Sequence, residues 1–124
     1  MPAAVAVALS ACATMAPRSC VAGTQPMTKL ELFFGGNIGA AEWRGFLADV
    51  VTPRFPDGFS VTDVQGQYRG ATGMIIAEQS RELMVIVPND GDGATRANAI
   101  RDAYKMRFRQ ESVLLVQSEV CAAF

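Results

Sequence analysis

The chain has 124 residues and a nearly balanced charge, with 11 lysines and arginines, 12 acidic residues and a net charge of −1. Such a balance creates no global field that favours nucleic acid, so we expect no nucleic-acid partner. The chain contains no histidine, and therefore lacks the commonest general base and the commonest metal ligand. These features exclude histidine-based catalysis and predict neither a cofactor nor a bound metal.

The first twelve residues have the pattern of a bacterial lipoprotein leader. An apolar run over residues 2–9 is followed by Leu9-Ser10-Ala11-Cys12, and a secretory leader combines an apolar segment with small residues at its cleavage site. The basic segment that normally precedes the apolar run is absent, so we expect the true translation start to lie upstream. We predict that residues 1–12 are a leader and that lipid on Cys12 anchors the protein to a membrane of the cell envelope, in the periplasm. The alternatives are ordinary cleavage near Cys12, which releases a soluble periplasmic protein, and an apolar segment that folds with the domain.

Residues 13–27 are predicted to be a tether, because they mix proline, glycine, serine and threonine. Residues 28–124 are then a single domain, long enough to hold one hydrophobic core. If Cys12 carries lipid, Cys20 and Cys121 form an even pair at the two ends of the domain. In an oxidising compartment such a pair predicts a disulfide, with two free thiols as the alternative.

A strand and a helix are predicted first. In residues 29–34 (KLELFF), alternate positions place Leu30, Leu32 and Phe34 on one face, which is typical of a strand with one buried face. In residues 40–51 the apolar side chains recur at helical spacing, at Trp43, Phe46, Leu47 and Val50. The helix should end before Pro53, because a residue that precedes proline avoids helical angles. Residues 55–58 (FPDG) have the composition of a β-turn.

A hairpin follows. Residues 59–68 and 74–87 are predicted strands, joined by the turn Gly70–Gly73, and Gly66 indicates a bulge in the first of them. The segment 83–87 (LMVIV) is apolar at every position, which indicates a central strand that is covered on both faces.

A second helix and a final strand complete the chain. Residues 95–108 place four side chains on one side of a helix, namely Ala97, Ile100, Tyr104 and Phe108. Asp92 is expected to cap this helix. Residues 112–116 (SVLLV) are the last predicted strand.

The element order β-α-β-β-α-β predicts an α+β domain with the ferredoxin-like fold: a four-stranded antiparallel sheet with two helices on one face. In this arrangement the first and last strands are antiparallel neighbours, so the start of the first lies beside the end of the last. Cys20 and Cys121 lie just outside those two points. The fold and the disulfide, inferred separately, therefore agree.

Several segments together resemble one bacterial family. They are residues 26–27 (PM), 32–35 (LFFG), 52–58 (TPRFPDG), 66–70 (GQYRG), 103–114 (AYKMRFRQESVL) and 121–124 (CAAF). The family is known only as domain of unknown function 3574, and the resemblance covers nearly all of residues 20–124. Its members often carry a secretory or lipoprotein leader and cysteines at both ends of the domain. This chain departs from them at Tyr68, where tryptophan is usual, and in a shortened loop over residues 35–39. The resemblance implies a cell-envelope protein and no particular reaction.

The hairpin carries the candidate ligand site. Alternate positions hold Gln65, Gln67 and Arg69 on the first strand, and Glu78, Ser80 and Glu82 on the second. We predict that these two rows face each other on the sheet face that the helices leave uncovered and line a cleft there. Arg69 and Glu78 would orient an anionic or polar ligand. The alternatives are plain cross-strand pairing on a wet face and a homodimer interface formed by that face.

Other motifs are weaker. Residues 89–93 (NDGDG) lack the ligand spacing of an EF-hand, and 35–39 (GGNIG) lack the lysine of a P-loop. Arg101, Lys105 and Arg109 form a basic stripe that is expected to be a solvated helix face, with contact to lipid phosphates or to an anionic polymer of the envelope as the alternative. Glu78 and Glu82 are the only carboxylate pair suited to acid–base work. We therefore predict non-catalytic binding of a partner or ligand; the alternative is a small dimeric ferredoxin-like enzyme that holds its substrate against the open sheet face.

Overall fold

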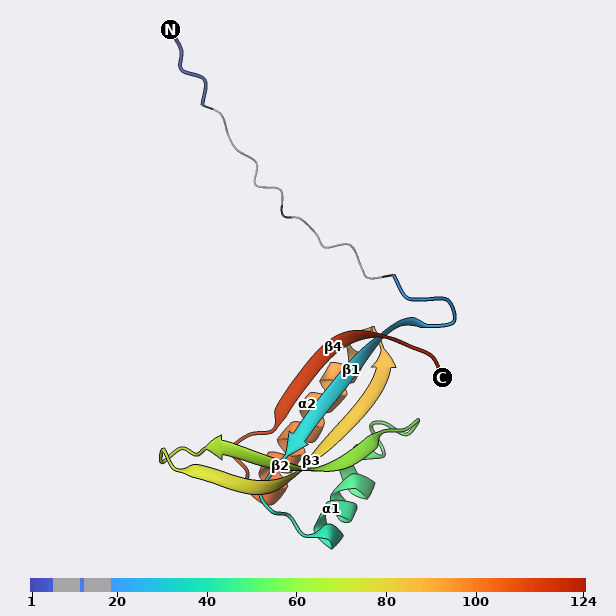
Figure 1. The fold of residues 1–124 in the computed structure, drawn as a ribbon, viewed down its shortest axis with the longest axis vertical. Coiled ribbons are helices and arrows are strands. Elements are labelled where there is room, and N and C mark those ends of the chain that lie inside the picture. Colours follow the sequence, from blue (N-terminus) through green and yellow to red (C-terminus); the bar gives the residue numbers. More distant parts are fainter. Residues whose placement is uncertain (6–11, 13–18) are drawn as a thin grey trace.

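The computed structural model describes residues 1–5, 12 and 19–124 (Figure 1). Residues 6–11 and 13–18, which make up half of the predicted leader and part of the predicted tether, lie outside the described residues. Cys12 is exposed and has a free thiol. No helix in the described part of the chain is both long enough and apolar enough to cross a membrane.

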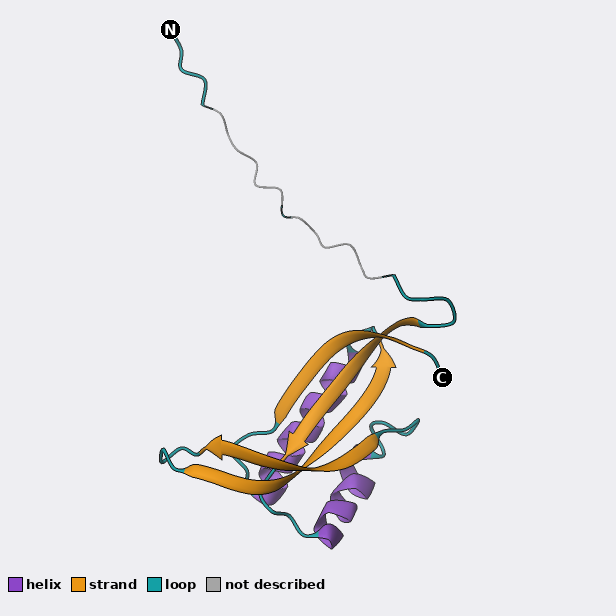
Figure 2. Cartoon of the chain, viewed as in Figure 1, coloured by secondary structure: helices purple, strands orange, loops and turns teal. Residues whose placement is uncertain are grey.

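A four-stranded antiparallel sheet in the order β2-β3-β1-β4 forms the framework of the domain (Figure 2). The strands are β1 (Gln25–Phe34), β2 (Ser60–Arg69), β3 (Ile75–Pro88) and β4 (Leu114–Ala122). Helix α1 (Ala40–Phe46), its continuation η1 (Leu47–Val51) and helix α2 (Asp92–Phe108) pack on one face. This arrangement confirms the predicted ferredoxin-like fold.

The hydrophobic core lies between the helices and the sheet face that they cover. Aromatic rings dominate it: the ring centroid of Phe34 lies 5.2 Å from that of Trp43 and 4.7 Å from that of Tyr104. Ile100 and Ala97 of α2 are fully buried beside them. The predicted buried faces of both helices are therefore confirmed. The sequence periodicity identified them because each helix has only one side that is shielded from water.

The first and last strands extend further than predicted. β1 begins at Gln25 instead of residue 29, and β4 runs over Leu114–Ala122 instead of residues 112–116. The two strands pair along their whole length, and Gln25 lies opposite Ala122. At the end of β4, backbone hydrogen bonds continue this pairing through residues that are mostly exposed, so the apolar pattern ends before the strand does. At the start of β1 the added residues include Met27 and Thr28, which are buried.

Local details of three predicted elements also differ. The end of the first helix is a π-turn, in which the N–H of Thr52 donates to the carbonyl of Leu47 at 2.8 Å. α2 begins at Asp92, so this residue is not the cap; its own N–H donates to the carboxylate of Asp90 at 3.0 Å. Gly66 pairs with a residue of β3 in unbroken register, so β2 has no bulge there.

The strand β3 is central, as predicted, but only one of its faces is fully covered. Leu83, Val85 and Val87 are buried under the helices, whereas Met84 and Ile86 on the other face are half-buried. The apolar run 83–87 therefore combines a core face with part of the open face of the sheet.

The predicted disulfide joins Cys20 to Cys121, with their Cα atoms 5.5 Å apart. Cys121 lies near the end of β4, opposite Pro26 of β1, so the antiparallel pairing of these strands brings the two cysteines together. The bond links the two ends of the folded domain.

The β2–β3 hairpin projects beyond the rest of the sheet. β3 pairs with β1 only over residues 81–88, whereas residues 75–80 pair with β2 alone. We call the two-stranded part, residues 64–80, the hairpin arm; Figure 1 shows it extending past β1 and β4. The base of this arm positions the candidate site.

Candidate functional site

A cavity of about 310 Å³ opens at the base of the hairpin arm. Three parts of the chain line it: the arm, the end of β1, and the connection between α2 and β4. The lining residues are Phe33, Gly35, Val64, Gln65, Gly66, Gln67, Tyr68, Glu78, Ser80, Gln110, Glu111, Ser112 and Leu114. We call it the open-face cavity, because its central side chains lie on the sheet face opposite the helices.

The strand register shows which side chains reach this face. Residues directly opposite each other in an antiparallel pair project to the same side. Glu82 lies opposite Phe33 of β1, on the face away from the core. Glu78 and Ser80 alternate with Glu82 along β3 and share its face. Glu78 and Ser80, two of the five predicted ligand-binding residues, therefore line the open-face cavity from the predicted face of the sheet; their binding of a ligand stays a prediction.

The other predicted row faces the opposite way. Gln65 lies opposite Gln79, and Arg69 lies opposite Ile75, so the side chains of Gln65, Gln67 and Arg69 project to the helix side of the sheet. The prediction that this row faces Glu78 and Ser80 is wrong, and so is the predicted pairing of Arg69 with Glu78.

The length of the hairpin loop explains the error. The loop contains five residues, 70–74, instead of the four-residue turn Gly70–Gly73. Its hydrogen bonds join the N–H of Gly70 to the carbonyl of Met74, and the N–H of Gly73 to the carbonyl of Gly70, each at 2.9 Å. Because side chains alternate with period two, one additional loop residue moves a whole row to the other face.

Gln65 and Gln67 border a second, shallower hollow on the helix side of the arm, of about 450 Å³. They also contribute to the wall of the open-face cavity. Asn37 and Gln79 line the same hollow, where the Asn37 side-chain oxygen accepts the Gln79 N–H at 3.0 Å. Arg69 does not line the open-face cavity.

The carboxylate of Glu78 is held in place by the end of β1. Its Oε2 atom accepts a hydrogen bond from the N–H of Gly36 at 2.9 Å. A Cβ atom on Gly35 would overlap this carboxylate, so the absence of a side chain at Gly35 allows the approach. Glu78 is half-buried, and its carboxylate is held in position without a ligand. Such preorganisation favours binding, because less conformational freedom is lost when a ligand binds.

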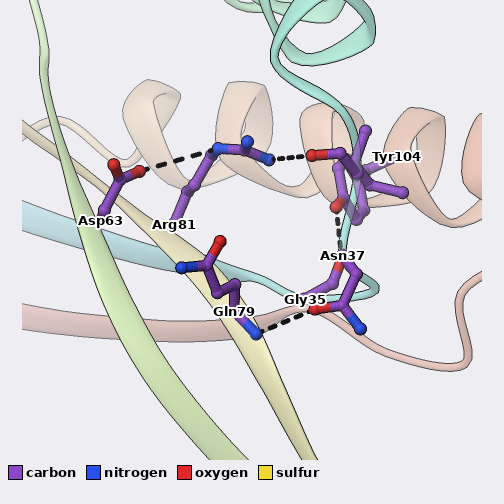
Figure 3. Close-up of polar contacts among 7 residues, drawn as sticks. Gly35, Asn37, Asp63, Gln79, Arg81 and Tyr104 are labelled. Carbon is purple, nitrogen blue, oxygen red and sulfur yellow. Dashed lines mark hydrogen bonds and ion pairs between the residues drawn. The ribbon is translucent and has the colours of Figure 1, made fainter.

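Further contacts fix the connection from β1 to α1, as Figure 3 shows. The hydroxyl of Tyr104 donates to the carbonyl of Gly35, and Arg81 donates to the carbonyl of Ile38 at 2.8 Å. The guanidinium of Arg81 also lies over the ring of Trp43, 5.2 Å from its centroid. Burial raises the pKa of Tyr104 to about 12, so its hydroxyl remains a proton donor at neutral pH. Core residues thereby determine the position of one cavity wall.

The cavity is acidic and partly aromatic. Tyr68, Glu78 and Glu111 all line it. Desolvation and the negative charges of Glu78 and Glu111 raise the pKa of the Tyr68 hydroxyl. No lysine or arginine is among the described residues that line the cavity. An anionic ligand would meet two carboxylates there and no compensating charge.

Glu78 and Glu82, the predicted acid–base pair, lie in different surroundings. Burial and a hydrogen bond with Glu31 raise the pKa of Glu82, whereas Lys29, 3.0 Å away, lowers the pKa of Glu31. Glu82 therefore belongs to a charge cluster on the open face, next to the cavity and not in its lining.

The basic stripe on α2 is largely occupied by contacts within the chain. Arg101 donates to the carbonyl of Val113 at 2.8 Å, and Lys105 forms an ion pair with Asp102 at 3.1 Å. Among the residues that the structure describes, no group of three or more His, Cys, Asp or Glu side chains is arranged to hold a metal ion.

Sequence reasoning missed part of the cavity wall, namely Phe33, Tyr68, Gln110, Glu111, Ser112 and Leu114. One signal was available in the predicted topology. The start of the last strand must lie beside the end of the first, so the polar connection before β4 must approach the base of the hairpin.

The fold and the open-face cavity define a small ferredoxin-like α+β domain with an acidic hollow at the base of its hairpin arm. The chain belongs to the family described as "Protein of unknown function (DUF3574)", whose sequence profile matches residues 29–124. No curated protein sequence matches the chain.

Solved structures share the fold at low identity. A phage SAM lyase in complex with S-methyl-5'-thioadenosine matches with a TM-score of 0.62 and 16% identity, over 79% of this chain and 90% of that one. The PII-like protein CPII from Thiomonas intermedia, bound to ADP, AMP and acetate, matches with a TM-score of 0.54 and 14% identity, over 82% and 92%. CutA from Synechococcus elongatus matches with a TM-score of 0.53 and 13% identity, over 78% and 80%. These likenesses show the fold alone.

Proposed function

We propose that the chain is a lipid-anchored domain of the cell envelope that binds a small polar ligand in the open-face cavity without turning it over. One observation carries the binding role: three separate parts of the chain converge on a single hollow, and the Glu78 carboxylate is fixed at its edge by Gly36. Concave sites with a few fixed polar groups among apolar ones are typical of ligand pockets.

The envelope location rests on the residues before the domain. Leu9-Ser10-Ala11-Cys12 has the pattern of a lipoprotein cleavage site, and lipid on Cys12 would anchor the domain to a membrane. The Cys20–Cys121 disulfide supports this proposal, because such bonds persist in oxidising compartments.

The first test is native mass spectrometry of the full chain, purified gently from its own envelope fraction. We expect the wild-type protein to retain a small molecule of defined mass. The mass of the protein itself shows whether Cys12 carries a lipid. S-methyl-5'-thioadenosine, an uncharged compound bound by a structural neighbour, is the first probe to add back. The ADP and AMP bound by another neighbour are anions, which the acidic lining of the cavity disfavours.

Two matched variants locate the bound molecule. Ser80→Phe places a ring in the open-face cavity, whereas Ser118→Phe makes the same change at an exposed position of β4 outside the cavity lining. The molecule should be lost from the Ser80→Phe protein and retained by the Ser118→Phe protein. A wild-type chain that carries nothing and binds none of the probes, or equal retention by both variants, would contradict the proposal.

The second candidate is a small dimeric enzyme that holds its substrate against the same face. One observation favours it: Glu78 and Tyr68 both line the open-face cavity, so a proton acceptor and a proton donor share one site. Turnover that disappears in Glu78→Gln, measured on any retained molecule, would support the enzyme. The homodimer through the open face stays a prediction, and size-exclusion chromatography with light scattering tests it.

A further inference from the structure

We infer that the open-face cavity selects an organic cation: a protonated or quaternary amine attached to an apolar or aromatic body. This inference rests on the proposed ligand-binding function and names the class of ligand. It follows from the charges in the cavity, from their lack of partners, and from the apolar residues beside them.

The first step concerns unbalanced charge. Glu78 and Glu111 both line the cavity. Five ion pairs join other side chains in the described part of the chain, and neither of these two carboxylates takes part in any of them. The N–H of Gly36 fixes Glu78 but does not neutralise it. A cation that enters the cavity therefore gains two charge partners that are not engaged with a lysine or arginine of the domain.

The second step concerns the aromatic ring of Tyr68. Tyr68 projects from the same face as Glu78, since Gly66, two residues before it in β2, lies directly opposite Glu78. Its side chain keeps 38% of its surface accessible, so part of the ring is available to a ligand. A cation held between carboxylates and an aromatic ring is stabilised by both, because the face of the ring carries negative potential.

The third step separates an organic cation from a metal ion. Hard cations such as Ca²⁺ and Mg²⁺ require six or more oxygen ligands, including their waters. Much of the cavity wall is instead apolar, formed by Phe33, Val64 and Leu114. A hydrocarbon surface offers no ligand atoms to a metal ion. It favours the apolar body of an organic amine, because burying that body removes apolar area from water.

The test compares two probes of nearly the same shape. 2-Phenylethylammonium and 2-phenylethanol differ in one terminal group, a charged ammonium or a neutral hydroxyl. Titrations of the full-length wild-type chain, followed by isothermal calorimetry or NMR, should show that the cation binds at least about tenfold more tightly. The advantage should shrink as the salt concentration rises, because the open side of the cavity exposes the charges to screening.

Two variants assign the preference to the cavity. Glu78→Gln should reduce the difference between the probes to less than about threefold. Glu42→Gln makes the same change in net charge at an exposed residue in the first turn of α1, and should leave the preference intact. Equal affinities for the two probes, or no binding of either, would overturn the inference, as would equal effects of the two variants.

The failure of this inference is distinguishable from the failure of the proposed function. If native mass spectrometry shows a neutral or anionic molecule that is lost in Ser80→Phe, the cavity binds a ligand and only the cationic class is wrong. If the wild-type chain retains nothing and binds neither the two probes named here nor S-methyl-5'-thioadenosine, both conclusions fail together.

Discussion

Removing the Cys20–Cys121 disulfide tests how this domain is stabilised. In the double variant Cys20→Ser/Cys121→Ser, the loss of stability should arise mainly in the unfolded state. Cys121 is exposed and Cys20 is half-buried, and the strand pairing beside them depends on backbone hydrogen bonds between β1 and β4. The native contacts of the core should therefore survive the substitutions.

The length of the closed loop determines the expected magnitude. The two cysteines are separated by 101 positions, and the chain-entropy model assigns about 4.7 kcal/mol to a loop of roughly 100 residues. Natural domains have a free energy of unfolding of about 5–15 kcal/mol, so the bond supplies a large share of the total. The variant should melt at least about 15 °C below the wild-type protein, since 1 kcal/mol shifts Tm by roughly 4–8 °C in a domain of this size.

Urea denaturation of both proteins, followed by the fluorescence of Trp43, measures the difference. The m-value should also be larger for the variant, because an unfolded chain without the cross-link exposes more surface. Ser118→Ala is the control, since Ser118 is an exposed residue of β4 outside the disulfide, and it should change neither quantity. Reductant should destabilise the wild-type protein and leave the double variant unchanged. A loss below about 1 kcal/mol with an unaltered m-value would refute the argument from loop closure.

Two further substitutions probe the core. Tyr104→Phe should lower the free energy of unfolding by about 1–2 kcal/mol, because a backbone carbonyl loses its buried donor; urea titration measures this, and an unchanged midpoint would contradict it. The folded pKa of Tyr104, about 12, lies above the usual value of 10.0, so its stabilising contribution is complete below pH 10 and is lost as the pH rises towards 12. The wild-type protein should therefore lose more stability than Tyr104→Phe between pH 9 and pH 11, and parallel losses would exclude Tyr104 as the cause. Gly93→Ala should destabilise by about 1–3 kcal/mol, although alanine favours helices, because its Cβ would lie 2.5 Å from a Val87 methyl group. Thermal melting checks this against Thr95→Ala, an exposed control, and a higher Tm for Gly93→Ala would show that the helix shifts to accept the methyl group.

The family, the order of elements, the core faces and the disulfide were predictable from the sequence. Helices and strands that are buried on one side leave a periodic record, as at Trp43 and Phe46 of α1. The even pair Cys20 and Cys121 needed only an antiparallel first and last strand to meet. Each of these inferences depends on side-chain chemistry over a short stretch of chain or on a known topology.

The candidate site was predictable only in part. Glu78 and Ser80 were assigned to the uncovered face, but their expected partners, Gln65, Gln67 and Arg69, lie on the other one. The extent of β4 was also underestimated, because its outer half pairs through the backbone while its polar side chains remain exposed. Neither error concerns which residues favour strands; both concern how strands pair.

The amino-acid sequence by itself determined where apolar and polar surface alternates, and hence the number, type and order of the elements. The tertiary structure alone decided the hairpin register, through a loop one residue longer than its turn sequence indicates. It also decided which distant segments meet at the cavity. Tyr68 precedes Glu78 in the chain and Glu111 follows it, and all three residues line the same cavity. The physical reason is that periodicity records the burial of each element separately, whereas a site depends on the relative placement of elements. That placement is set by loop lengths and backbone pairing, which leave little trace in residue type.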